Sequence, residues 1–170
     1  MRAALIAVLV LLLAAPGSLA GEFVANESHF QCLLDGVKPE GRDFYVFHRN
    51  RRRLRKAVKV ARRGRPGKEY PVGTILQLFP FEAMVKRGKR YNPEGNGWEF
   101  FQLVPRADGT TTIASRGAGE VQNVIGSCQG CHMNVAADFD LVCETARGRG
   151  GLGLSPEQVA ALQAGDPRCR

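Results

Sequence analysis

The most chemically distinctive segment of the 170-residue sequence is C-Q-G-C-H, from Cys128 to His132. Two thiols three residues apart can reach the two vinyl groups on one edge of a porphyrin and form thioether bonds. The histidine that follows is then held under the ring, where its imidazole can coordinate iron. The motif therefore predicts one covalently attached c-type haem, with Cys128 and Cys131 as attachment sites and His132 as a ligand of the iron.

Three other kinds of site can use the same two cysteines: a redox dithiol, half of a zinc site and a structural disulfide. Thioredoxin-type redox motifs follow the first strand of a βαβ pattern, and this sequence shows no such pattern. A zinc site needs two more ligands, which Cys143, His29 or His48 could supply only through a long-range arrangement. Haem attachment is the leading interpretation, and these three remain its alternatives.

The first 20 residues have the three regions of a secretory signal peptide. Arg2 provides a basic start, residues 3–15 form an apolar run, and residues 18–20 (S-L-A) form an A-x-A-like cleavage site. The apolar run is shorter than the roughly 17 to 25 residues that a membrane-spanning helix needs. We expect cleavage after Ala20, no membrane span, and a protein in the periplasm or secreted, where c-type haem is attached. Residues 21–170 are then predicted to form a single domain.

The chain is basic, with a formal net charge of +8 that falls to +7 when Arg2 is removed. Residues 49–68 hold eleven Lys or Arg and no acid, and apolar residues recur within and before this stretch at near-helical spacing: Phe47, Leu54, Val58 and Ala61. This pattern predicts an amphipathic helix with a cationic outer face that ends at Gly64. Such a face could bind a polyanion, steer an acidic redox partner or an anionic substrate, or be merely solvated. Export and the absence of interleaved aromatic residues argue against nucleic acid as the partner.

The middle of the chain reads as strands separated by turns. Runs of β-branched and aromatic residues predict strands over residues 73–79, 98–104 and 110–114, and the turn at residues 107–109 is short enough to close a hairpin. Residues 81–89 are predicted to hold a short helical turn. Ser155, Pro156 and Gln158 have the pattern of a helix start, which predicts a last helix over residues 156–164. The expected fold class is α+β, an antiparallel sheet with flanking helices.

The late position of the motif bears on the second axial ligand of the iron. Only 38 residues follow His132, and their one methionine, Met133, is too close to His132 to reach the other side of the ring. A His/Met electron carrier of the usual design is therefore disfavoured. The candidates that precede the motif are His29, His48, Met84 and the lysines, of which His48 is typical of a surface residue and Met84 of core filling.

Without a strong sixth ligand, the iron would be five-coordinate and open to a small gaseous or nitrogenous ligand. We expect phenylalanines to line the open side of such a haem, with Phe44, Phe79 and Phe81 as candidates. The same three side chains could instead belong to the hydrophobic core.

The order of these motifs resembles the cytochrome P460 family, which includes the cytochromes c′-beta. The segments that carry the resemblance are residues 70–74, residues 85–91, residues 96–100, and Cys128 to His132 followed by residues 140–142. The resemblance implies an antiparallel sheet with flanking helices, a homodimer, and a c-type haem with His132 as proximal ligand.

The resemblance also implies a choice between two functions. Some family members oxidise hydroxylamine and carry a lysine cross-linked to the porphyrin; others lack the cross-link and bind nitric oxide or carbon monoxide. Here Leu78 occupies the place of that lysine, and no lysine lies between Lys68 and Lys86. Ligand binding or single-electron transfer is therefore favoured over oxidation of hydroxylamine or nitric oxide or decomposition of peroxide. Those reactions would need a distal acid or base. Glu82, Glu99 and Glu120, the acids considered in the β-rich region before the motif, are expected to be solvated.

The other three cysteines, Cys32, Cys143 and Cys169, can form one disulfide and leave one thiol over. A bond between Cys143 and Cys169 is the favoured pairing, because it would close the C-terminal helix back onto the domain. The spacing alone leaves the other two pairings open.

Overall fold

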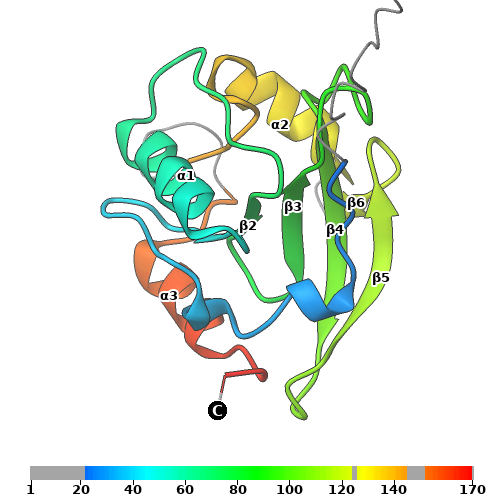
Figure 1. The fold of residues 1–170 in the computed structure, drawn as a ribbon. Helices are drawn as coiled ribbons and strands as arrows, with labels where there is room; N and C mark the ends of the chain where they lie inside the picture. The colour runs from blue at the N-terminus through cyan, green and yellow to red at the C-terminus, as the bar shows by residue number, and fades with distance from the viewer. Residues whose placement is uncertain (1–21, 124–125, 145–151, 170) are drawn as a thin grey trace, which may run out of the picture.

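The computed structural model describes residues 22–123, 126–144 and 152–169, and is drawn in Figure 1. Its centre is an antiparallel sheet in the order β1-β2-β3-β4-β5, with strands Tyr45–Phe47, Ile75–Gln77, Glu82–Lys86, Trp98–Pro105 and Thr111–Gly117. Two short strands, β6 and β7, pair separately over Gln122–Asn123 and Gly126–Ser127. The α-helices in the described part are α1 (Arg51–Arg63), α2 (Cys128–Ala136) and α3 (Pro156–Ala164). The α+β class with an antiparallel sheet is confirmed; the predicted signal peptide lies outside the described residues.

The sheet is covered on both faces by elements far apart in the sequence. One face carries Val46, Leu76, Met84 and Phe100, which lie in adjacent register and pack with Ala57 and Ala61 of α1. The opposite face packs against the N-terminal segment, where the rings of Phe30 and Phe101 lie 5.0 Å apart. Figure 1 shows α1 and α3 on one side of the sheet and this blue segment against β4 and β5. No helix among the described residues is long and apolar enough to cross a membrane.

Strand β3 corrects one sequence prediction. The segment expected to hold a short helical turn, residues 81–89, instead contains a central strand that pairs with β2 through Val85 and Ile75 and with β4 along its whole length. Alternate side chains enter the two cores, since Met84 faces α1 while Ala83 and Val85 face the N-terminal segment. Pairing on both edges overrides the weak local preference of a short segment, so the turn prediction was wrong.

Helix α1 agrees with its prediction at the C-terminal end. Asn50 caps the start by accepting a hydrogen bond from the backbone N–H of Arg53, and Gly64 ends the helix in the left-handed region, with φ of 48°. Phe47, which shares the apolar spacing, belongs to β1 instead. Helix α3 also has its predicted bounds, because Ser155 and Gln158 form the capping box.

The C-terminal turn after α3 is fastened to the N-terminal segment. Asp166 accepts a hydrogen bond from the backbone N–H of Leu33 at 2.8 Å and forms a fully buried ion pair with Arg168 at 2.7 Å. Cys169 follows directly and forms a disulfide with Cys32, their Cα atoms 4.8 Å apart. The expected pairing with Cys143 is therefore wrong, because the C-terminal turn lies against the chain near Leu33.

Replacing Cys32 and Cys169 together by serine is expected to lower the free energy of unfolding by about 2–4 kcal/mol, because the disulfide closes a long loop and restricts the unfolded chain. Urea unfolding under oxidising conditions measures the difference. Cys143→Ser is the matched control and should leave stability within about 1 kcal/mol of the wild type. A larger loss in the control than in the double variant would contradict the assigned pairing.

Candidate functional site

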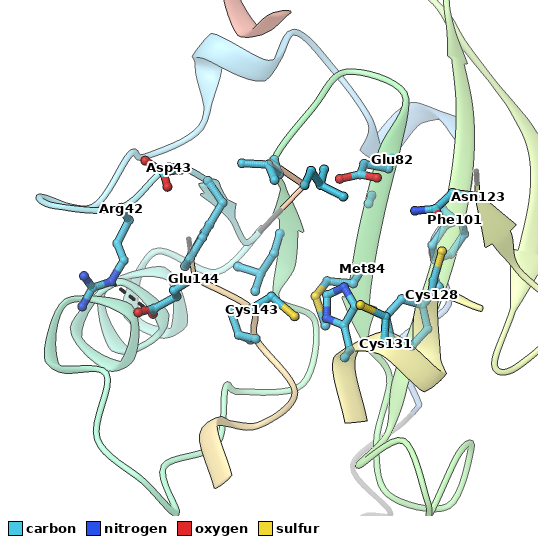
Figure 2. A pocket seen from close by; sticks show the side chains of 18 residues that line it. Arg42, Asp43, Glu82, Met84, Phe101, Asn123, Cys128, Cys131, Cys143 and Glu144 are labelled. Carbon is cyan, nitrogen blue, oxygen red and sulfur yellow. Dashed lines mark ion pairs between the residues drawn. The ribbon is translucent and has the colours of Figure 1, made fainter. Parts of the chain in front are cut away.

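A cavity lies between the sheet and α2, with about 1070 Å³ of empty space in it and at its mouth. Its described lining comes from five parts of the chain: residues 42–44, strands β2 to β4 with Leu78, Asn123 of β6, helix α2, and residues 142–144 with Leu152. Figure 2 shows Cys128 and Cys131 at one end of the cavity and Arg42, Asp43 and Glu144 at the other.

Helix α2 presents the cysteine and histidine side chains together. The helix begins at Cys128, after Ser127, whose Oγ accepts a hydrogen bond from the N–H of Gly130 at 3.1 Å. Residues three and four apart share one side of a helix, so Cys128, Cys131 and His132 all point the same way. All three line the cavity. Sequence patterning does not reveal this helix, because its functional side carries sulfur and imidazole in place of an apolar stripe; the capping serine is its one local signal.

One nitrogen of the His132 imidazole is engaged in a hydrogen bond. Its Nδ1 lies 2.6 Å from the backbone oxygen of Leu141, and a carbonyl oxygen can only accept, so Nδ1 carries the proton. Nε2 is then the unprotonated nitrogen that a metal requires. Burial lowers the pKa of His132, which also favours the neutral ring. The ring of Phe100 packs against it edge-on, at 5.2 Å between centroids.

The backbone that carries the Leu141 oxygen adopts a constrained conformation. Asp140 and Leu141 have φ angles of 55° and 58°, in the left-handed region that residues with a Cβ rarely occupy. Both are buried. A conformation of this kind persists only where surrounding contacts impose it.

Asp140 is the centre of those contacts. Its carboxylate accepts hydrogen bonds from the backbone N–H of Tyr70 at 2.7 Å, from Nζ of Lys86 at 2.5 Å, and from the side-chain amide of Asn96. Its backbone oxygen accepts from Nε1 of Trp98 at 2.7 Å. We call these five residues the Asp140 cluster; it draws together the four segments on which the family resemblance rests. The cluster fixes the chain immediately before Leu141 and so positions His132.

Lys86 and Asp140 form a buried ion pair within this cluster. Both side chains are almost fully enclosed, and the ammonium group also lies 5.0 Å from the centroid of the Trp98 ring. Burial lowers the pKa of Lys86 and raises that of Asp140, and the attraction between the two charges opposes both shifts. Removing one partner would leave the other charge buried and uncompensated.

The structure separates the predicted apolar lining into two sets. Phe44 and Leu78 line the cavity, together with Met84. Phe79 and Phe81 lie outside the described lining: their rings stack on each other at 5.2 Å, with Phe79 buried and Phe81 44% exposed. They flank Pro80 in the connection between β2 and β3.

The two remaining histidines lie outside the described lining as well. Nε2 of His48 is 3.0 Å from the backbone oxygen of Val72, and Nδ1 of His29 contacts Asn26. Cys143, the third zinc candidate, does line the cavity. Within residues 22–123, 126–144 and 152–169, no three His, Cys, Asp or Glu side chains form a group suited to a metal ion. The ligand set that the zinc alternative requires is therefore not assembled there.

Glu82 was expected to be solvated, yet it lines the cavity from the first position of β3. Burial raises its pKa to about 7, so the carboxyl group can gain or lose a proton near neutral pH. Glu99 is also buried, but it is engaged by Arg116 at 2.7 Å and by Arg87 at 3.2 Å. Of the three acids considered from the sequence, Glu120 is the exposed one.

Glu82→Gln is expected to change how stability depends on pH. The pKa of Glu82 is about 7 in the folded protein against 4.5 for an ordinary glutamate. Between these two pH values the folded state binds more protons than the unfolded state, so stability falls as pH rises. The variant should lack this pH dependence. Its free energy of unfolding relative to the wild type should therefore rise by about 1–3 kcal/mol between pH 4.5 and pH 8. Urea unfolding at both pH values measures it, with exposed Glu120→Gln as control. Equal pH dependence in Glu82→Gln and the wild type would contradict the assignment.

A buried ion pair occupies the end of the cavity away from the cysteines. Nε of Arg42 lies 3.2 Å from the carboxylate of Glu144 and donates to the backbone oxygen of Ala61 at 2.7 Å. Arg42 is the cation of the described lining, and its guanidinium is already engaged by Glu144 and by backbone oxygens. No local pattern in the sequence predicts this pair.

Comparison of the chain with protein-family models, with curated proteins and with solved structures found no match in any of the three. The chemistry of the cavity therefore has to follow from its own side chains. These comprise two thiols and an imidazole on one helix, apolar walls, one carboxyl group that titrates near pH 7, and an arginine at the far end. Such a set fits a haem attached at Cys128 and Cys131 and ligated by His132.

Proposed function

We propose that the protein is a periplasmic or secreted mono-haem c-type cytochrome of the P460 or c′-beta kind. It binds nitric oxide or a similar small ligand at an open haem iron, or transfers single electrons. Cys128 and Cys131 hold the haem through thioether bonds, and Nε2 of His132 coordinates its iron. The observation that carries the proposal is the hydrogen bond from Nδ1 of His132 to the backbone oxygen of Leu141. This bond leaves Nε2 unprotonated and able to bind a metal, in a cavity that two thiols also line.

The walls of the cavity support binding of an uncharged small ligand. Leu76, Leu78, Phe100 and Val142 all line it and make this part of its surface apolar. A ferrous haem with an open position supplies the site at which a diatomic gas binds. Met84 lines the same cavity, and its thioether is the ligand that would instead close this position in a single-electron carrier.

Absorption spectra of the purified protein distinguish these roles. The oxidised and dithionite-reduced forms are recorded with and without nitric oxide, for the wild type and for Met84→Leu. We expect a high-spin, five-coordinate spectrum that shifts when nitric oxide is added, and no change of spin state in Met84→Leu. A low-spin spectrum that does not shift with nitric oxide, and becomes high-spin in Met84→Leu, would overturn ligand binding in favour of electron transfer.

A second candidate function, oxidation of hydroxylamine or nitric oxide, is favoured by Glu82. An acid or base whose pKa lies near 7 inside a cavity is suited to moving the protons that such oxidations release. Leu78 lines the cavity at the place where the resemblance puts a cross-linking lysine, and no lysine belongs to the described lining. Turnover of hydroxylamine with a single-electron acceptor, lost in Glu82→Gln and retained in Glu120→Gln, would establish this activity; no turnover by the haem-loaded wild type would exclude it.

A further inference from the structure

Helix α1 carries a dense cationic surface that the proposed haem chemistry does not use. Its 13 residues include no acid, and eight of its basic residues are exposed. Six of these eight form what we call the α1 cationic face: Arg51, Arg52, Arg55, Lys56, Lys59 and Arg63. The helix lies on the outside of the molecule (Figure 1). Its Ala57 and Ala61 are buried in the core. These charged side chains are therefore exposed to solvent on one surface of the molecule.

This charge distribution destabilises the helix that carries it. Arg51 and Arg52 stand in the first turn, where the positive end of the helix dipole repels cations. Basic residues also face each other four positions apart, as in Arg51 with Arg55 and Arg55 with Lys59, and like charges at this spacing repel. Folding alone does not account for such a pattern, whereas an anionic partner would relieve the repulsion.

The shape beside the helix narrows the kind of partner. A shallow groove has Val37, Leu54 and Val58 along its apolar part, and basic residues from the same side of α1 around it: Arg55, Lys59, Arg62 and Arg63. Val37 is 39% exposed there, so apolar surface is open to solvent within a cationic rim. A polypeptide segment with an apolar side chain between carboxylates complements both features.

Two other polyanions match the groove less well. Nucleic acid binds single bases by stacking them on aromatic rings, and no aromatic residue belongs to the described lining of this groove. A membrane surface takes up apolar side chains that project outward from a helix, whereas those of α1 either face the core or lie recessed between cations. Charge and shape together favour an acidic polypeptide.

We propose that the α1 cationic face and its groove form a docking surface for an acidic segment of a partner protein, one with apolar side chains between its carboxylates. Arg42 connects this surface to the cavity, because it lines the cavity and donates to the backbone oxygens of Ala61 and Arg62 in the last turn of α1. A docked partner would therefore sit beside the cavity. The docking surface is independent of what the cavity holds.

The test uses the full mature chain and a defined probe. The probe is a dye-labelled 12-residue peptide made of three Glu-Glu-Leu-Glu repeats, and its control has glycine in place of each leucine, at the same charge. Binding is followed by fluorescence anisotropy at low ionic strength. We expect the leucine peptide to bind at least about fivefold more tightly than the glycine peptide, since only the former fills the apolar part of the groove.

Charge reversal locates the binding surface. Arg55→Glu with Lys59→Glu should weaken binding of the leucine peptide at least about tenfold. Arg90→Glu with Arg106→Glu, an exposed pair outside α1, changes the net charge equally and should weaken it less than about twofold. Circular dichroism confirms that both variants fold, which is expected because all four side chains are exposed.

Three results would overturn the proposal. Equal binding of the two peptides would show that the groove is not used. Equal losses in the two reversal variants would show that net charge alone attracts the peptide. Phosphatidylglycerol vesicles or a 20-nucleotide oligodeoxythymidine could bind more tightly than the leucine peptide and lose this binding when Arg55 and Lys59 are reversed. Either result would reassign the surface, to a membrane or to nucleic acid respectively.

Discussion

Replacing Cys128 and Cys131 together by serine is expected to abolish covalent haem attachment, because serine cannot form the two thioether bonds. His132→Ala should retain some covalently bound haem but lose the protein's ligand to the iron, which changes the spin state of the reduced form. Haem staining of denaturing gels measures the covalent bond, and absorption spectra measure the ligation.

Cys143→Ser is the matched control for this result. Cys143 lines the same cavity and lies outside the disulfide, yet it is fifteen residues beyond the start of the helix that presents the motif. Haem attachment should be unchanged in this variant. Loss of haem in Cys143→Ser, or its retention when both motif cysteines are serine, would contradict the assignment of the attachment sites.

Asp140→Asn is expected to cost about 3–5 kcal/mol of stability, because it leaves the buried ammonium of Lys86 without its counter-charge. It also weakens the hydrogen bonds that hold the backbone of Leu141 in place for His132. Urea unfolding measures the first effect. The reduction potential of the haem-loaded protein reports the second, since the hydrogen bond to a ligating histidine tunes the metal.

Two further variants make the Asp140 result specific. Lys86→Met combined with Asp140→Asn should be more stable than Asp140→Asn alone, because the uncompensated charge is removed. Exposed Asp138→Asn, two residues earlier, should change stability by less than about 0.5 kcal/mol. A loss below about 1 kcal/mol in Asp140→Asn, or no recovery in the double variant, would contradict the role given to the ion pair.

Local signals predicted the parts of the fold that local chemistry determines. The capping box of Ser155 and Gln158 predicted the start of α3, and Gly64 predicted the end of α1. The short turn at residues 107–109 correctly joins β4 to β5 as a hairpin. Each of these features depends on residues within a few positions of one another, so the sequence contains the whole signal.

Features that depend on distant partners were not predictable in the same way. Strand β3 forms because two other strands pair with it, and Cys32 meets Cys169 because the C-terminal turn docks beside Leu33. The site shows the same division. The sequence predicted a site at Cys128, Cys131 and His132, which the structure brings to one cavity, but it did not predict the Leu141 oxygen, since a backbone atom leaves no trace in residue type. Glu82 reads as an ordinary surface acid until the fold places it in the cavity.

The most direct test of the account is the intact mass of the mature protein, purified after export from a host that attaches c-type haem and denatured before measurement. We expect the mass of residues 21–170 with one disulfide plus one haem, because thioether bonds survive denaturation. The mass of the polypeptide alone, or of a polypeptide with a second disulfide between Cys128 and Cys131, would contradict the central claim that this cavity holds a covalent haem.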